Sequence, residues 1–113
     1  MGTVTVRHNP QQSRFETDVN GELATLDYEQ RGNSIALTHT KVPRKAWNMG
    51  IGSALARAAL EYAQGAATPV IPECEFVVTF LKRNPKYLNI VDSEHRRAIE
   101  AHQRKQTEGG MAA

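Results

Sequence analysis

The chain has 113 residues, of which 40% are hydrophobic and 23% charged, the composition of an ordinary globular domain that is long enough to build its own core. A formal net charge of +2 is too small to favour nucleic acid as a partner. One cysteine excludes an internal disulfide framework, and the sequence shows neither a signal peptide nor the roughly 18 consecutive apolar residues of a membrane span. We therefore expect a cytoplasmic monomer that binds neither membrane nor nucleic acid.

The first forty residues alternate between apolar and polar side chains, which is typical of strands with one buried face. The pattern predicts strands at residues 4–7, 14–19, 24–29 and 34–42. Asn20-Gly21 and Arg31-Gly32-Asn33 separate the later runs, and Asn-Gly is a strong hairpin signal. Four strands with short links indicate an antiparallel meander whose inner face needs a cover.

The cover is predicted in the second half, where apolar residues recur at helical spacing from Ile51. The predicted buried stripe is Ile51, Ala54, Leu55, Ala58, Ala59, Tyr62 and Ala63. Gly65 stands at the expected C-terminal cap. Residues 69–72 read as a short extended segment, and Phe76, Val77, Phe80 and Leu81 form a second helical stripe that ends before Pro85.

Ser93 is predicted to cap a last, weakly packed helix that runs to about Lys105. Residues 1–106 are expected to form one domain, with a disordered tail at 107–113. The fold class is therefore α+β, with four N-terminal strands followed by helix, strand, helix and a C-terminal helix.

The junction between the fourth strand and the first helix has the pattern of an anion site. The helix begins with Gly50-Ile51-Gly52, so free backbone N–H groups and the positive end of the helix dipole lie beside glycines that allow close approach. On spacing alone a tight turn is the commoner interpretation of Gly-x-Gly. Leu55 stands where a Rossmann fingerprint has its third glycine, and no Gly-Lys-Ser/Thr of a Walker A loop occurs.

Four segments form a pattern that is more specific than its parts: HTKVP from His39, GIGSALARAALEYA from Gly50, VIPECEFV from Val70 and FLKRNPKY from Phe80. Taken together, they resemble a compact, single-domain branch of the GNAT superfamily of N-acetyltransferases. The resemblance extends from about Phe15 to Val91. The chain departs from the family pattern at Trp47, where an arginine is usual, at Asn48, where a glycine is usual, and at Asn84, where a histidine is usual.

The resemblance implies a mixed, mostly antiparallel sheet and acetyl-CoA as co-substrate. The pantetheine arm would pair with the strand that ends at Thr40-Lys41-Val42, the pyrophosphate would meet the amides of residues 48–53, and residues 82–87 would lie near the adenosine. The predicted cofactor-binding residues are Thr40, Val42, Asn48, Met49, Gly50, Ile51, Gly52, Ser53, Asn84 and Tyr87.

Cys74 and His39 are the candidate catalytic residues. Cys74 precedes a helix, where a thiolate is favoured, and the family resemblance places it near the thioester as base, covalent acetyl acceptor or wall. Its alternative is a small buried hydrophobe. His39 titrates in the range useful for deprotonating an amine, and its alternative is a structural strand-end histidine.

Other side chains are given simpler interpretations. Glu73 and Glu75 either assist deprotonation or face solvent, and Trp47 lies over the ligand or, as we favour, covers an edge of the core. His8, His95 and His102 lack metal-ligand spacing with other potential ligands, so no metal is predicted.

Three functions remain open from the sequence. The first is acetyl transfer from acetyl-CoA to a primary amine, on a small molecule or a protein lysine. The second is a non-catalytic module that binds CoA or acyl-CoA, and the third is a protein-interaction domain without CoA affinity.

Overall fold

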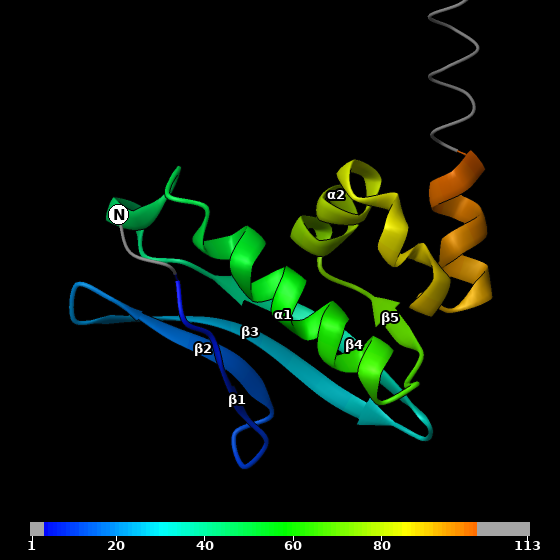
Figure 1. Ribbon diagram of the computed structural model, residues 1–113, viewed down its shortest axis with the longest axis horizontal. Coiled ribbons are helices and arrows are strands. Elements are labelled where there is room, and N and C mark those ends of the chain that lie inside the picture. Colours follow the sequence, from blue (N-terminus) through cyan, green and yellow to red (C-terminus); the bar gives the residue numbers. More distant parts are fainter. Residues whose placement is uncertain (1–3, 102–113) are drawn as a thin grey trace, which may run out of the picture.

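A computed structural model describes residues 4–101, and Figure 1 shows their arrangement. The strands are β1 (Arg7–Asn9), β2 (Arg14–Val19), β3 (Glu22–Arg31), β4 (Ser34–Lys41) and β5 (Val70–Pro72). The helices are α1 (Ile51–Gly65) and α2 (Glu75–Arg83), with short 3-10 turns η1 (Arg44–Ala46) and η2 (Pro85–Ile90). One more helix covers residues 93–101 of the described range. None of the helices within residues 4–101 is long and apolar enough to cross a membrane.

The strands form one sheet in the order β1-β2-β3-β4-β5. The first three pairings are antiparallel and β5 runs parallel to β4, which confirms the predicted mixed, mostly antiparallel sheet. Asn20 and Gly21 both have positive φ, 51° and 84°, as a two-residue type I′ hairpin between β2 and β3 requires.

The first strand begins later than predicted, at Arg7 instead of residue 4. Val4 and Val6 still pack against the core, so the alternation was correct, but the ladder does not reach them. The Thr17 hydroxyl donates to the Thr5 carbonyl at 2.7 Å, so that a side chain on β2 satisfies the carbonyl in place of a ladder partner.

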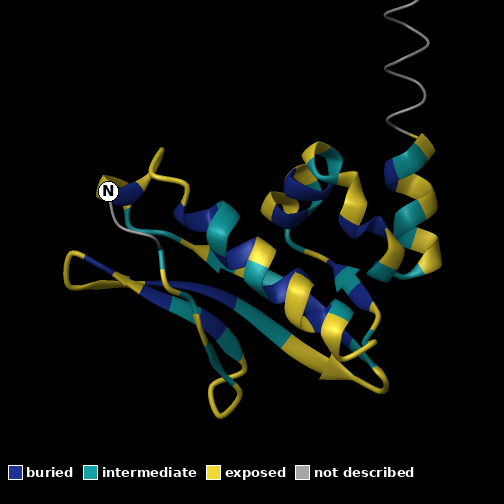
Figure 2. Cartoon of the chain, in the orientation of Figure 1, coloured by how far each residue is buried: buried dark blue, intermediate teal, exposed yellow. Residues whose placement is uncertain are grey.

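The core lies between the sheet and α1, which crosses β2 and β3 (Figure 1). The buried face of α1 differs from the predicted stripe, because Ala56 and Leu60 are fully buried whereas Tyr62 is 44% exposed. The helix contacts α2 and η2 as well as the sheet. Its buried face is therefore wider than predicted, and Figure 2 shows the buried and exposed residues that alternate along the helix.

The helix α1 ends in a Schellman motif whose left-handed residue is Ala67, at φ 51°, and the predicted cap at Gly65 is wrong. The Thr68 N–H donates to the Ala63 carbonyl at 2.9 Å, and the Ala67 N–H donates to the Gln64 carbonyl at 3.2 Å. Gly65 is simply the last helical residue, so an alanine occupies the position that favours glycine.

The last helix is capped by Asp92 and not by Ser93. The Asp92 carbonyl accepts the N–H of Arg96 at 2.9 Å, and its carboxylate accepts the N–H of His95 at 3.4 Å. Ile99 is 4% exposed and belongs to the core, so this helix packs better than expected. Its predicted end near Lys105 and the predicted tail at 107–113 lie outside the described residues.

Replacing Ala67 by glycine should stabilise the protein. A left-handed conformation costs a residue with a Cβ about 1–2 kcal/mol, and glycine removes this cost. The greater conformational entropy of glycine in the unfolded chain offsets part of the stabilisation. We expect the free energy of unfolding to rise by about 0.5–1 kcal/mol in urea titrations. Ala66→Gly is the matched control, since Ala66 has an ordinary φ of −93° and should lose stability. A loss at both positions would contradict the strain at Ala67.

A second prediction concerns His8, whose ring lies in an aromatic cluster between the sheet and α1. It stacks on Phe15 with ring centroids 4.5 Å apart, approaches Tyr62 at the same separation, and its Nε2 lies 2.7 Å from the Tyr28 hydroxyl. Burial lowers the pKa of His8 below 6.5.

The neutral form of His8 is therefore favoured by folding. The penalty for protonation is absent above the unfolded pKa of about 6.5 and grows as pH falls towards the folded pKa. When the pH is lowered from 7.5 to 5.5, the free energy of unfolding should fall less for His8→Phe than for the unmodified chain. Denaturant titrations at the two pH values measure this difference. Equal losses would show that His8 does not carry this dependence.

Candidate functional site

A cleft opens where β4 and β5 part. Their ladder ends at the pair Leu37 and Pro72, and the Leu37 carbonyl then accepts the N–H groups of both Glu73 and Cys74 at 3.0 Å. Beyond this point β4 continues to Lys41, whereas the other chain segment turns away into α2. Residues 38–41 therefore have no strand beside them on this side of the sheet within the described structure.

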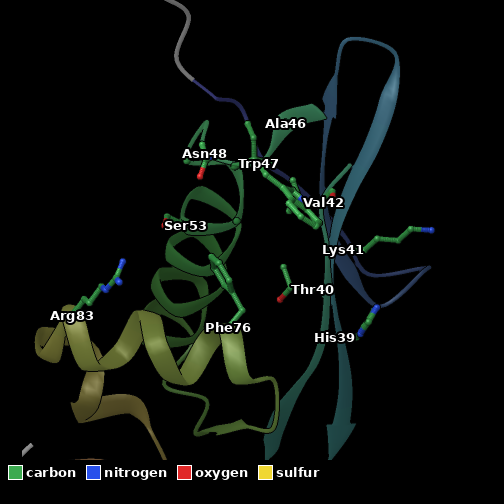
Figure 3. A pocket seen from close by; sticks show the side chains of 13 residues that line it. His39, Thr40, Lys41, Val42, Ala46, Trp47, Asn48, Ser53, Phe76 and Arg83 are labelled. Carbon is green, nitrogen blue, oxygen red and sulfur yellow. Dashed lines mark hydrogen bonds between the residues drawn. The ribbon is translucent and has the colours of Figure 1, made fainter. Parts of the chain in front are cut away.

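A β-bulge in β4 decides which side chains face the cleft. Tyr28 pairs with Leu37 and Asp27 with His39, so Thr38 is the extra residue. The alternation is reset after it, and Thr40 and Val42 then share the inward face with Leu37. His39 and Lys41 are exposed, and Figure 3 shows their side chains on the opposite side of the strand from Thr40.

The cleft contains a cavity of about 860 Å³ (Figure 3). It is lined by His39, Thr40, Lys41, Val42, Ala46, Trp47, Asn48, Gly50, Ile51, Gly52, Ser53, Phe76 and Arg83. Seven of the ten predicted cofactor-binding residues are among them. The volume is within the range of sites for small molecules and cofactors.

One wall of the cavity is the first turn of α1. The first backbone bond at this helix start joins the Ala54 N–H to the Gly50 carbonyl at 3.0 Å. Among the described residues no acceptor is found for the N–H groups of Ile51, Gly52 and Ser53, and no side chain caps the helix. These donors and the helix dipole make this wall attractive to an anion.

The loop before α1 contains two residues in the left-handed conformation. Asn48 and Gly50 have φ values of 74° and 75°, in the left-handed region. Asparagine is among the residues that tolerate this region best after glycine. Asn48 therefore performs the conformational role of the usual glycine.

Gly52 makes room for a neighbouring aromatic ring. A Cβ at this position would lie 2.6 Å from Cζ of Phe76, so the missing side chain makes room for that ring. Phe76 comes from the first turn of α2, is 42% exposed and lines the cavity. The helical spacing of apolar residues had placed Phe76 in a core stripe. The signal in the sequence for its contact with α1 was a glycine at the second helical position.

The predicted adenosine segment, residues 82–87, reaches the cavity through Arg83. Asn84 instead donates from Nδ2 to the Phe80 carbonyl at 2.9 Å, close to the end of α2. Tyr87 is 2% exposed and donates its hydroxyl to Glu61 at 2.8 Å. Burial and the Glu61 carboxylate both raise the pKa of Tyr87. The structure therefore gives Asn84 and Tyr87 structural contacts and does not bring them to the cavity.

Met49 also lies outside this cavity. It is 55% exposed and lines a smaller hollow of about 380 Å³, which shares Ile51 with the lining of the main cavity.

The two candidate catalytic residues, Cys74 and His39, occupy different positions relative to the cavity. The Cys74 thiol is 3.1 Å from the Thr40 hydroxyl, so it stands behind a residue that lines the cavity, at the point where the two chain segments part. His39 contributes to the lining from β4, but its imidazole points away from Thr40 (Figure 3). Cys74 therefore lies next to Thr40 where the two segments part but is not among the residues that line the cavity, whereas His39 is among them with its imidazole turned away from Thr40.

The acidic neighbours of Cys74 are on the surface. Glu73 is paired with Arg31, with one N···O separation of 3.0 Å, and this partner lowers the pKa of the Glu73 carboxyl. Glu75 is exposed in the first turn of α2. Glu73 is therefore held as a carboxylate in an ion pair and is a poor base.

The expectation that Trp47 covers an edge of the core is wrong. Its side chain is 57% exposed, lines the cavity, and donates from Nε1 to the Val42 carbonyl at 2.8 Å. The guanidinium of Arg44 lies 5.4 Å from the ring centroid.

One group of potential metal ligands forms away from the cavity. Atoms of Asp92, Glu94 and His95 lie within 4.8 Å of one another, so the expectation that His95 has no carboxylates at ligand spacing was wrong. Asp92 caps the last helix and its carboxylate lies 3.0 Å from Nδ1 of His95, which accounts for the proximity without an ion.

Residues 14–90 match the family model of the GCN5-related N-acetyl-transferases. The chain belongs to this family. It is 33% identical to protein NATD1 of Mus musculus over 87 residues, which cover 74% of this chain and 79% of that protein. Identity to NATD1 of Homo sapiens is 32% over 85 residues, with coverage of 73% and 75%.

The solution structure of a GCN5-like protein from Staphylococcus aureus superposes with a TM-score of 0.63 at 24% identity. The match covers 81% of this chain and 91% of that one. At this identity the likeness establishes the fold alone, and it confirms the GNAT-like arrangement predicted from the sequence.

Proposed function

We propose that the chain is an acetyl-CoA-dependent N-acetyltransferase and that the cavity between β4, α1 and α2 holds the donor. The observation that carries this proposal is that one cavity joins the unbonded N–H groups of α1 to the opening between β4 and β5. An anionic group and an extended arm can therefore be bound together. The acceptor would be a primary amine.

The pyrophosphate would bind the N–H groups of Ile51, Gly52 and Ser53. These three residues line the cavity at the positive end of the helix dipole, and Arg83 of α2 lines it as well (Figure 3). The arginine usual in the family is absent at Trp47, and Arg83 would supply a positive charge from the other wall.

The pantetheine arm would run along residues 38–41 of β4 and bring the thioester to the level of Thr40 and Cys74. There the nitrogen of a neutral amine attacks the acetyl carbon, a C–N bond forms and the C–S bond breaks. The sulfur leaves as the CoA thiolate and receives a proton, while the amine nitrogen gives one up. Most of the acceleration would come from positioning and from backbone polarisation of the carbonyl.

Cys74 is the side chain placed to act at this point, either by moving the proton or by accepting the acetyl group first. His39 is the weaker candidate, since its imidazole points to the opposite side of β4 from Thr40 (Figure 3). We also propose that the enzyme is a monomer of the cytoplasm, as expected from the sequence.

The donor site can be tested by titrating isotope-labelled protein with acetyl-CoA and following the backbone amide shifts. Saturable shifts should cluster on residues 42–54 and around Cys74. Gly52→Glu should remove detectable binding, because it adds negative charge at the phosphates and displaces Phe76. Ser53→Glu adds the same charge without the clash and should weaken binding at least tenfold, about 1.4 kcal/mol.

Gln64→Glu is the control, because it places the same charge at the far end of α1 and should bind normally. If the unmodified chain shows no shifts at millimolar acetyl-CoA, the chain is not a CoA-binding protein and the interaction-domain interpretation takes precedence. If it binds but turns over with no amine, it is a non-catalytic CoA module.

Cys74→Ala should leave acetyl-CoA affinity within about twofold and slow acetyl transfer by about 10²-fold or more, the usual contribution of a positioned proton-transfer group. Transfer is followed by the release of CoA thiol, and intact protein mass would reveal an acetylated Cys74. Cys74→Ser separates the loss of thiol chemistry from the loss of volume. Turnover unchanged in Cys74→Ala would mean that the thiol only forms part of the wall.

A further inference from the structure

Trp47 is a large aromatic side chain that lines the cavity. It is not part of the core, and the family pattern has a different residue at its position. The usual family residue here is an arginine, and the Trp47 side chain is 57% exposed at the cavity wall. We propose that Trp47 is the stacking surface for the adenine of CoA, so that this residue makes the enzyme selective for nucleotide-bearing donors. The inference rests on the proposed donor site.

The ring of Trp47 is held in place before any ligand arrives. Its Nε1 donates to the Val42 carbonyl at 2.8 Å, and the Arg44 guanidinium lies over the ring at 5.4 Å from its centroid. A hydrogen bond at the edge and a cation on one face restrict the side chain to one orientation. An exposed but immobilised ring binds a planar partner with little further loss of entropy.

Part of the ring surface remains free on the cavity side. Trp47 lines the cavity and Arg44 does not, so the cation covers a part of the ring turned away from the ligand space. Neighbouring Lys45 is engaged by Glu22 at 2.6 Å and does not compete for the ring. Every nucleobase has a π face, and stacking on such a ring is a recurrent way to hold a base.

The position of Trp47 along the cavity fits the nucleotide half of the donor. Figure 3 shows Trp47 at the end that also holds Ala46 and Asn48, whereas Thr40 and Phe76 lie towards the other end. The thioester would be at Thr40, and the pyrophosphate at the first turn of α1. The ribose and adenine that continue beyond the pyrophosphate would then remain at the Trp47 end.

The chain contains one tryptophan, so its fluorescence reports directly on this ring. The unmodified protein should be titrated with CoA, with adenosine 3′,5′-bisphosphate and with 4′-phosphopantetheine. CoA and the bisphosphate should quench the emission of Trp47, since both carry adenine. Phosphopantetheine should bind, as seen by calorimetry, with little quenching.

Trp47→Ala should weaken CoA by about 5- to 150-fold in calorimetry, the range equivalent to stacking one base. Its affinity for phosphopantetheine should stay within about twofold of the unmodified chain. Trp47→Phe retains a flat ring and should recover most of the CoA affinity. Phe76→Leu is the matched control, because it alters the other exposed aromatic side chain of the cavity and should leave the ratio of the two affinities unchanged.

Equal losses for CoA and phosphopantetheine in Trp47→Ala would overturn the inference, since Trp47 would then only support the loop. A selective loss in Phe76→Leu would overturn it too and move the base to that ring. Both outcomes leave the proposed donor site standing, because the unmodified chain still binds CoA. Absence of CoA binding by the unmodified chain would instead refute the proposed function, and this inference with it.

Discussion

The carbonyl group of Leu37 accepts two backbone N–H groups, and the rest of the site depends on this arrangement. By bonding to both Glu73 and Cys74 it ends the parallel pairing of β4 with β5 and turns the second segment into α2. A parallel sheet that continued would have filled the space with a ladder. Instead the unpaired side of β4 faces a cavity, and the first turn of α1 closes one end of it.

Two backbone details then determine what faces that cavity. The bulge at Thr38 shifts the side-chain alternation by one residue, which turns Thr40 inward and His39 outward. The left-handed residues Asn48 and Gly50 direct the chain so that α1 begins with its N–H groups free. Both details determine which groups face the cavity.

Three aromatic side chains in and near the site are held in different ways. Gly52 lets the Phe76 ring lie against the first turn of α1, in a place from which a Cβ at residue 52 would displace it. Trp47 is held by a backbone carbonyl and a guanidinium and is left largely exposed. In contrast, Tyr87 is fully enclosed and ties η2 to α1 through Glu61, which is a structural role.

The sequence by itself determined most of the elements, the hairpin at Asn20-Gly21, the family resemblance and the helix start at which we propose an anion site, because these depend on local periodicity, on Asn-Gly turns and on a glycine-bearing helix start. Seven of the ten predicted cofactor-binding residues line the cavity for the same reason, since six of them belong to one contiguous segment and Thr40 lies just before it. The tertiary structure decided what depends on contacts between distant segments. It set the buried face of α1, which packs against α2 and η2 as well as the sheet, and it set the exposure of Trp47. It also separated Cys74 from His39, because a one-residue bulge reverses the direction of a side chain and leaves no trace in the hydrophobic pattern.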